Sequence, residues 1–281
     1  DGDADIRLHR LVSSSGVIRA ITARMRSRSW RRRAQAAALA PLLADGDPRR
    51  LKLLTDRHPT VRARAAAHLE PSDVVAAVDE LLALLGDPNP AARFSAQQAL
   101  LRGDGRIVPH LAAYLEEEEG DGIAWALEIA ASMPDPRLYA AISRHTRSKD
   151  PRRRAVAAGA IAPDAHGAFL LGELIDDLDA DVRSAAVAAT AAYGGEVLAA
   201  RIGDLLSDQS WKVRLEAGQT LAALGPVGAL TLRHHLFDAD PYARDMARRA
   251  LDDIAAREGR QVLPAPVPPG LDPWTDEEQA A

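Results

Sequence analysis

The chain has 281 residues with no cysteine and only 4% aromatic residues, which excludes disulfides, thiolate metal sites and cysteine nucleophiles. Its 35 basic and 40 acidic residues give a formal net charge of −5, too small by itself to indicate a nucleic-acid or membrane protein. Alanine makes up the largest part of the 47% hydrophobic content, which favours close helix packing over a core of large side chains.

The chain begins with a strongly basic region. Nine arginines and no acidic residue lie between Arg7 and Arg33, and residues 1–70 carry +8 (15 basic, 7 acidic) against −13 (20 basic, 33 acidic) for the remainder. The spacing of Val17, Ile18, Ile21 and Met25 predicts an amphipathic helix within this region.

Three roles for the basic region stay open. It is a solvated cap of the structure that follows, a docking surface for an acidic partner or a second copy, or a contact for phosphates of nucleic acid or anionic lipid. The candidate anion-binding residues are Arg19, Arg24, Arg26, Arg28, Arg31 and Arg32.

A motif of about 30 residues, Asp-x-x-x-Val-Arg-x-x-Ala, recurs along most of the chain. We call its arginines the anchor arginines: Arg33, Arg62, Arg93, Arg154, Arg183, Arg214 and Arg244. Their intervals are 29, 31, 61, 29, 31 and 30 residues, so a degenerate repeat with Ile123 at the anchor position fills the double interval. Three residues after each anchor position stands a phase alanine: Ala36, Ala65, Ala96, Ala126, Ala157, Ala186, Ala217 and Ala247.

Each repeat is predicted to contain two helices. Residues 74–85 show a helical apolar stripe, and the Asp87-Pro88 pair then ends this first helix before a second one begins. Asp-Pro pairs recur at 47–48, 135–136, 150–151 and 240–241 as helix starts, and Gly103, Gly194 and Gly225 are expected to close second helices in a left-handed conformation. The phase alanines are expected to let neighbouring second helices approach closely.

Aspartates stand six residues before several anchors, and we call Asp56, Asp87, Asp177, Asp208 and Asp238 the turn aspartates. Each is predicted to cap its own turn and to face an anchor arginine of a neighbouring repeat. This ladder is assigned to Arg62, Arg93, Arg183, Arg214 and Arg244 together with the five turn aspartates. The alternative, a row of arginines that binds phosphates, is disfavoured because the matched carboxylates would neutralise it.

The repeat Asp-(Pro)-x-x-x-Val-Arg-x-x-Ala-x-x-Ala-Leu resembles the short HEAT-like repeats of the phycobilisome-lyase type. The resemblance covers residues 15–256 and implies a right-handed, all-α solenoid of about eight two-helix repeats. It says little of function, because the family consists mostly of interaction scaffolds with a few enzymes among them. The sequence departs from the pattern at Ile123 and in the basic first repeat.

The second helices usually line the inner curve of such a solenoid. Trp125 in the degenerate repeat is the most interesting position there, although a helical tryptophan more often fills core; Trp30 and Trp211 are expected to pack on the preceding first helices. The candidate partner-binding residues are Phe94, Gln98, Trp125, Glu128, Leu215, Gln219 and Arg249. The acidic run 116–119 is read as a solvated helix end.

No catalytic or metal motif is found: the eight histidines show no metal-site spacing, and no nucleophile elbow or phosphate-binding loop occurs. The sequence therefore predicts a non-enzymatic protein without cofactor or metal. Residues 257–281 are proline-rich and acidic and are expected to be disordered, with Leu271 to Trp274 as a possible linear motif.

Taken together, residues 1–256 are predicted to form a solenoid with residues 1–33 as its basic cap. The predicted function is a monomeric, cytoplasmic scaffold that binds another protein along its concave face. The alternatives are a phycobilisome-lyase-like chromophore attachment factor, or binding of nucleic acid or anionic lipid through the arginine-rich start. Nucleic acid is disfavoured by the acidic remainder, and a membrane would be reached only through the basic region or an anchor upstream of Asp1.

Overall fold

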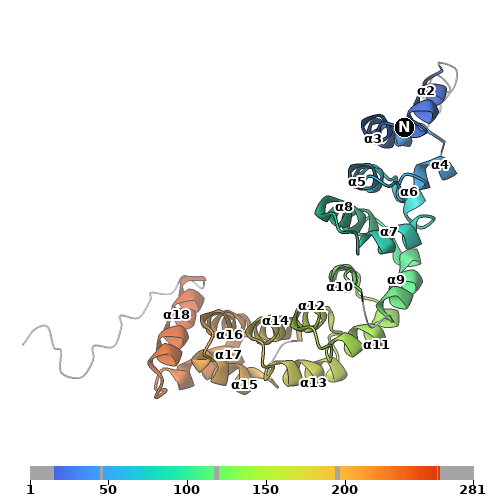
Figure 1. Cartoon of the computed structure of the whole chain (residues 1–281). Coiled ribbons are helices and arrows are strands. Elements are labelled where there is room, and N and C mark those ends of the chain that lie inside the picture. Colours follow the sequence, from blue (N-terminus) through green and yellow to red (C-terminus); the bar gives the residue numbers. More distant parts are fainter. Residues whose placement is uncertain (1–15, 45–46, 117–119, 194–196, 258, 260–281) are drawn as a thin grey trace, which may run out of the picture. The chain divides into compact units, whose positions relative to one another are not determined.

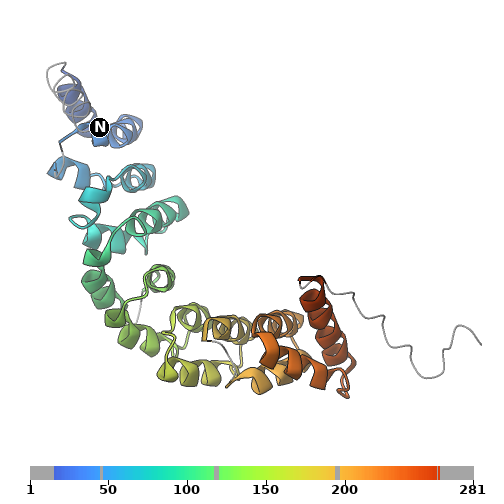
Figure 2. The same cartoon turned by 180° about the vertical axis from the view of Figure 1, so that it is seen from behind.

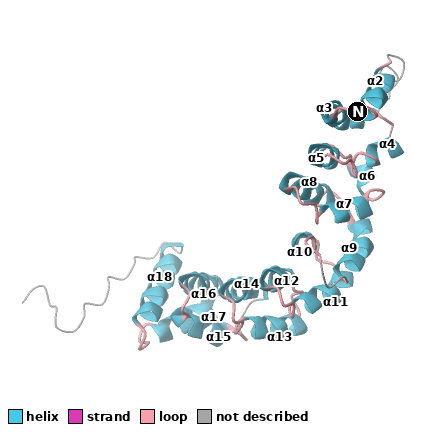
Figure 3. Ribbon diagram, in the orientation of Figure 1, coloured by secondary structure: helices cyan, strands magenta, loops and turns pink. Residues whose placement is uncertain are grey.

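The computed structural model describes residues 16–44, 47–116, 120–193, 197–257 and 259. Regular structure in this part of the chain is entirely helical, without strands (Figure 3). None of the described helices is long and apolar enough to cross a bilayer. The α-helices are α2 (Val17–Met25), α3 (Trp30–Ala38), α4 (Pro48–Leu51), α5 (Pro59–Ala67), α6 (Pro71–Val74), α7 (Val78–Leu84), α8 (Pro90–Leu100), α9 (Val108–Leu115), α10 (Ile123–Ser132), α11 (Pro136–His145), α12 (Pro151–Ala160), α13 (Ala165–Leu174), α14 (Ala180–Thr190), α15 (Ala199–Asp204), α16 (Trp211–Ala223), α17 (Gly225–His235) and α18 (Pro241–Arg257).

The described residues divide into two compact units, the first ending at residue 193 and the second beginning at residue 197. In the first unit the second helices α3, α5, α8, α10, α12 and α14 follow one another in a row, each in contact with the next (Figure 1). The first helices form a parallel row beside them, which Figure 2 shows from behind. In the second unit α16 contacts α18 and α15 contacts α17. The prediction of an all-α solenoid built from two-helix repeats is therefore confirmed.

The phase alanines lie on the buried side of the second helices. Ala65 is 5% exposed, and the other seven are fully buried. Within the first unit one continuous apolar core runs from Ala34 to Ala160. A small buried side chain lets the helices packed around it approach closely without leaving a void, which explains why the sequence repeats alanine at a fixed phase.

Helix α2 packs its apolar side on the rest of the chain. Ile21 is fully buried against Ala36 and Leu43, and Val17, Ile18 and Met25 pack partly buried around the same cluster. The predicted amphipathic helix therefore uses its apolar side for internal packing and turns its arginines outward.

Some predicted helix boundaries are wrong. The single helix expected over residues 74–85 is two helices, because α6 ends at Val74 and α7 begins at Val78. Asp87-Pro88 lies in the turn before α8, and the helix itself begins at Asn89-Pro90, where Asn89 Oδ1 accepts the backbone N–H groups of Ala91 and Ala92. The apolar stripe over residues 74–85 and the Asp87-Pro88 pair correctly indicated a helical segment followed by a break, but neither fixes the residue at which a helix starts.

Of the three glycines predicted to end second helices in a left-handed conformation, one has that conformation, one does not, and one is not described. Gly225, the first residue of α17, has φ of +64°, a left-handed conformation that favours glycine. Gly103 is not left-handed, so that prediction is wrong; a Cβ there would lie 2.9 Å from the Leu100 carbonyl oxygen, and close approach explains the glycine instead. Gly194 lies outside the described residues.

Replacing Ala96, fully buried between helices of the first unit, by leucine should overpack the row. The expected cost is about 1–3 kcal/mol of unfolding free energy. The control is Ala91→Leu on the same helix, where the methyl group is exposed. Urea unfolding followed by circular dichroism measures both, and equal stability of Ala96→Leu and the parent would contradict the packing described.

Candidate interaction surfaces

The anchor arginines share one geometry. In every repeat that has one, its Nη1 atom donates to the backbone carbonyl of the residue six positions earlier; for Arg62 this is the Asp56 oxygen, at 2.7 Å. The other six make the same bond at 2.6 to 2.9 Å: Arg33, Arg93, Arg154, Arg183, Arg214 and Arg244. Each guanidinium thus closes the turn of its own repeat, which satisfies a carbonyl that the helix leaves without a partner.

In Arg33, Arg62 and Arg154 the remaining guanidinium nitrogens reach the next repeat. Arg62 Nε lies 2.6 Å from Asp87 Oδ2 and Arg62 Nη2 lies 2.9 Å from Asp87 Oδ1, a bidentate pair. Arg33 forms the same pair with Asp56, and Arg154 forms it with Asp177. Because both groups are nearly buried, these pairs fix the register of successive repeats.

Each turn aspartate also accepts the backbone N–H two residues later, for example Asp87 Oδ1 from Asn89 at 2.8 Å. Burial alone raises the pKa of Asp56, Asp87 and Asp177, but hydrogen bonds from the arginine and from this backbone N–H hold each pKa below its ordinary value. The carboxylates stay ionised, so the anchor arginines they pair with are neutralised.

The ladder is interrupted in the second unit, where the predicted pairing of Arg214 with Asp238 is wrong. Asp238 Oδ2 lies 2.9 Å from His235 Nδ1, while the Arg214 guanidinium lies over the Tyr242 ring, 4.8 Å from its centroid. A nearby histidine and an aromatic ring outcompete the expected pair for the two groups. For Arg93 the corresponding acidic position is Glu117, outside the described residues, as are Glu118 and Glu119.

Further ion pairs do not follow the repeat. Arg50 Nη1 lies 2.5 Å from Asp73 Oδ2 with both side chains about as buried as core residues (3% and 4% exposed). At the start of three first helices, the aspartate of an Asp-x-Arg triplet pairs with the arginine two residues later. In the third of these, the Arg137 side chain and backbone N–H lower the pKa of Asp135 to about 2. Sequence reasoning missed these pairs, although the repeated Asp-x-Arg spacing is a visible signal.

The candidate partner-binding residues of the first unit differ in exposure. Phe94 on α8 is 55% exposed and Gln98 is exposed beside it on the same helix. Trp125 on α10 is half-buried and packs against the core. Glu128 is tied to Gln97, whose Nε2 donates to Glu128 Oε2 at 2.8 Å. Phe94 and Gln98 are therefore the accessible pair on this stretch of second helices.

In the second unit Gln219 and Arg249 are exposed and Leu215 is half-buried. Sequence reasoning placed Trp211 against a first helix, but Trp211 is 68% exposed, and Tyr242 on α18 is 61% exposed. Trp30 is half-buried, and its ring stacks on His58 of the following repeat, with centroids 4.1 Å apart. The position of a tryptophan within the repeat does not predict its burial, because Trp30 and Trp211 both stand three residues before an anchor arginine and differ in exposure.

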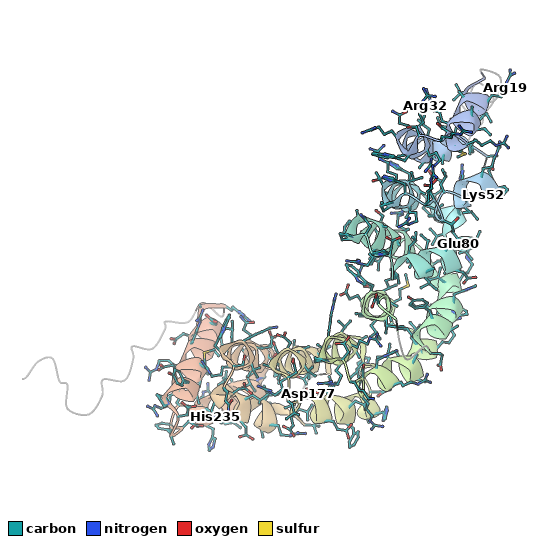
Figure 4. All side chains as sticks on the ribbon, in the orientation of Figure 1. Arg19, Arg32, Lys52, Glu80, Asp177 and His235 are labelled. Carbon is teal, nitrogen blue, oxygen red and sulfur yellow. The ribbon has the colours of Figure 1, made fainter. Side chains whose placement is uncertain are left out.

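The second unit also has an open hollow beside α15 and α17, which sequence reasoning missed. Leu230 at 67% exposure and Phe237 at 89% form its apolar rim, and Arg233 and His234 add polar groups. His235, buried against Gly203, forms part of the lining (Figure 4). Among the described residues no cluster of three or more His, Asp or Glu is placed to hold a metal ion.

The candidate anion-binding arginines are all exposed: Arg19, Arg24, Arg26, Arg28, Arg31 and Arg32. Arg19 and Arg24 lie on α2, Arg26 and Arg28 follow it, and Arg31 and Arg32 begin α3. Figure 4 shows Arg19 and Arg32 at this end of the first unit. None of the six forms an ion pair with another described residue, in contrast to the anchor arginines.

No protein-family model and no curated protein matches the chain. Solved structures do overlap with it. They include an engineered protein (19% identity, 74% of this chain and 95% of that chain, TM-score 0.34), YibA of E. coli (15%, 89% and 92%, TM-score 0.45) and human deoxyhypusine hydroxylase in complex with glycerol (17%, 92% and 100%, TM-score 0.36). With TM-scores below 0.5, these overlaps assign no function to this chain.

The prediction of a non-enzymatic protein, which was based on the absence of catalytic motifs, is wrong. One of the overlapping structures, human deoxyhypusine hydroxylase, is that of an enzyme. Whether this chain catalyses a reaction is not decided by missing sequence motifs, because functional groups can be added to one fold in many ways.

The depressed pKa values of Asp56, Asp87 and Asp177 predict acid sensitivity. Below the unfolded pKa of about 4 the unfolded chain binds more protons than the folded one, so stability present above about pH 5 is lost as pH falls further. Urea unfolding at pH 7, 5 and 3 measures this. Asp87→Asn should reduce the loss between pH 5 and 3, and an unchanged acid dependence in that variant would refute the assignment.

Proposed function

We propose that the chain is a scaffold that binds another protein through the exposed side of its second helices. The observation that supports this most directly is the exposure of large aromatic side chains there: Phe94 on α8, Trp211 on α16 and Tyr242 on α18, between 55% and 68% exposed. Exposed aromatic residues of this size are costly in water and are enriched at the centres of protein interfaces.

The surroundings of these side chains support the same role. The phase alanines and paired anchor arginines are committed to internal packing, whereas Gln98, Gln219 and Arg249 are exposed on the same helices as the aromatic residues. Amide and guanidinium groups around an apolar anchor supply the polar rim that typical interfaces have. Arg214, stacked on Tyr242, adds a rigid cation beside an exposed ring.

Site-specific photo-crosslinking tests this function. Benzoylphenylalanine replaces Phe94 on second helix α8 in one variant and Phe169 on first helix α13 in the control, since the two side chains are similarly exposed, at 55% and 60%. After irradiation in an extract of the source cells, position 94 should capture a discrete protein about tenfold more than position 169 does.

The proposal fails if position 94 captures nothing, or if both positions capture the same proteins equally. Purified partner identified at position 94 should then lose affinity for Phe94→Ala by about 1–2 kcal/mol, measured by calorimetry. An unchanged affinity would show that the crosslink reports proximity rather than binding.

A further inference from the structure

The described residues between 16 and 70 contain thirteen basic and three acidic side chains. Four of the cations are neutralised: Arg33 by Asp56, Arg49 by Asp47, Arg50 by Asp73 and Arg62 by Asp87. The other nine have no ion pair with a described residue and are all exposed: Arg19, Arg24, Arg26, Arg28, Arg31, Arg32, Lys52, Arg57 and Arg64. We call these nine the cationic surface; Figure 4 labels three of its members.

Parts of the cationic surface are held close together although they are distant in sequence. Arg57 Nη2 donates to the backbone carbonyl of Arg28 at 3.4 Å, which places the two turns side by side. Helices α2, α3 and α5 pack in succession, so the charges form one region rather than isolated positions. Like charges gathered this way repel one another, and an anionic partner relieves that repulsion.

The start of α3 also lacks the negative charge that a helix N-terminus favours. Arg31 and Arg32 lie in its first turn, no acidic residue does, and the Ser29 side chain makes no capping bond. Cations at the positive end of a helix are unfavourable, and an anion there is favourable. The lack of negative charge at this helix start and the nine cations without an ion pair to a described residue are separate observations that point to an anionic ligand.

The structure also separates the possible anions. Trp30 is already engaged: its ring stacks on His58, with centroids 4.1 Å apart, and the Arg31 guanidinium lies 5.0 Å from its centroid, which disfavours stacking of a nucleobase on this ring. The apolar side of α2 packs on the chain, with Ile21 fully buried and Val17, Ile18 and Met25 partly buried, so it is engaged internally and not presented for insertion into a membrane. Residues 71–281 have a net charge of −13 (20 basic, 33 acidic), which repels a long polyanion.

We propose that the cationic surface binds a short acidic segment of a partner protein. Exposed guanidinium groups form forked, charge-assisted hydrogen bonds with carboxylates, and a segment of a few residues stays clear of the acidic remainder of the chain. This surface is distinct from the exposed aromatic side chains of the second helices, so the proposal stands or falls independently of the proposed function.

The test is fluorescence anisotropy of the full chain with a labelled peptide of about ten glutamates, at about 50 mM and about 300 mM salt. Binding is expected at low salt and should weaken strongly at high salt. The variant Arg31→Ser/Arg32→Ser should reduce affinity several-fold, and serine at all six of Arg19, Arg24, Arg26, Arg28, Arg31 and Arg32 should reduce it by at least about tenfold.

The matched control removes four exposed arginines that have carboxylate partners: Arg106, Arg137, Arg144 and Arg147. Its affinity for the peptide should stay within about twofold of the parent. Circular dichroism melts verify folding, and the double variant serves if the sixfold variant unfolds. No binding at low salt, or an equal loss in the control, overturns the proposal.

Competition identifies the anion. A duplex oligonucleotide and vesicles containing phosphatidylserine are added at equal total charge to the bound peptide. Weak displacement by both agrees with an acidic protein segment. Stronger binding of the duplex, or of the vesicles, than of the peptide overturns the proposal and identifies a phosphate ligand instead.

Discussion

The rest of the structure depends on one interaction: an anchor guanidinium shared between two repeats, as at Arg33, Arg62 and Arg154. One nitrogen of Arg62 holds the turn of its own repeat through the Asp56 carbonyl, and the others hold Asp87 of the next repeat. Arginine suits this task because its planar group donates in several directions at once and stays charged when nearly buried. The same residue therefore closes a turn and sets the register between neighbours.

The sequence contains its own evidence for this coupling. Where no anchor arginine precedes a repeat, the turn aspartate is absent: Ser27 stands at that position in the first repeat, and Ser148 stands there after Ile123. A buried carboxylate without its arginine would be destabilising, so a repeat that follows no anchor arginine has no turn aspartate either. The basic surplus that remains lies outside the ladder, in the cationic surface, which is why that surface and not the arginine row is available to anions.

Much of the fold could be predicted from the sequence because the repeat is regular. The phase alanines and the Arg62–Asp87 spacing depend on positions within a single repeat and recur often enough to be recognised. What escaped prediction depends on a single neighbour: the capture of Asp238 by His235, the buried Arg50–Asp73 pair and the exposure of Trp211. The candidate surfaces were located less well than the fold for the same reason, since exposure at one phase varies from repeat to repeat.

A double-mutant cycle on Arg62 and Asp87 tests the central claim most directly. Arg62→Leu alone should cost about 3 kcal/mol of unfolding free energy, because it leaves a nearly buried carboxylate without its partner. In the double variant Arg62→Leu/Asp87→Asn much of that loss should be recovered, giving a coupling energy of at least about 1 kcal/mol. Additive losses from the two substitutions would contradict the account, since the pair would then contribute no register between the repeats.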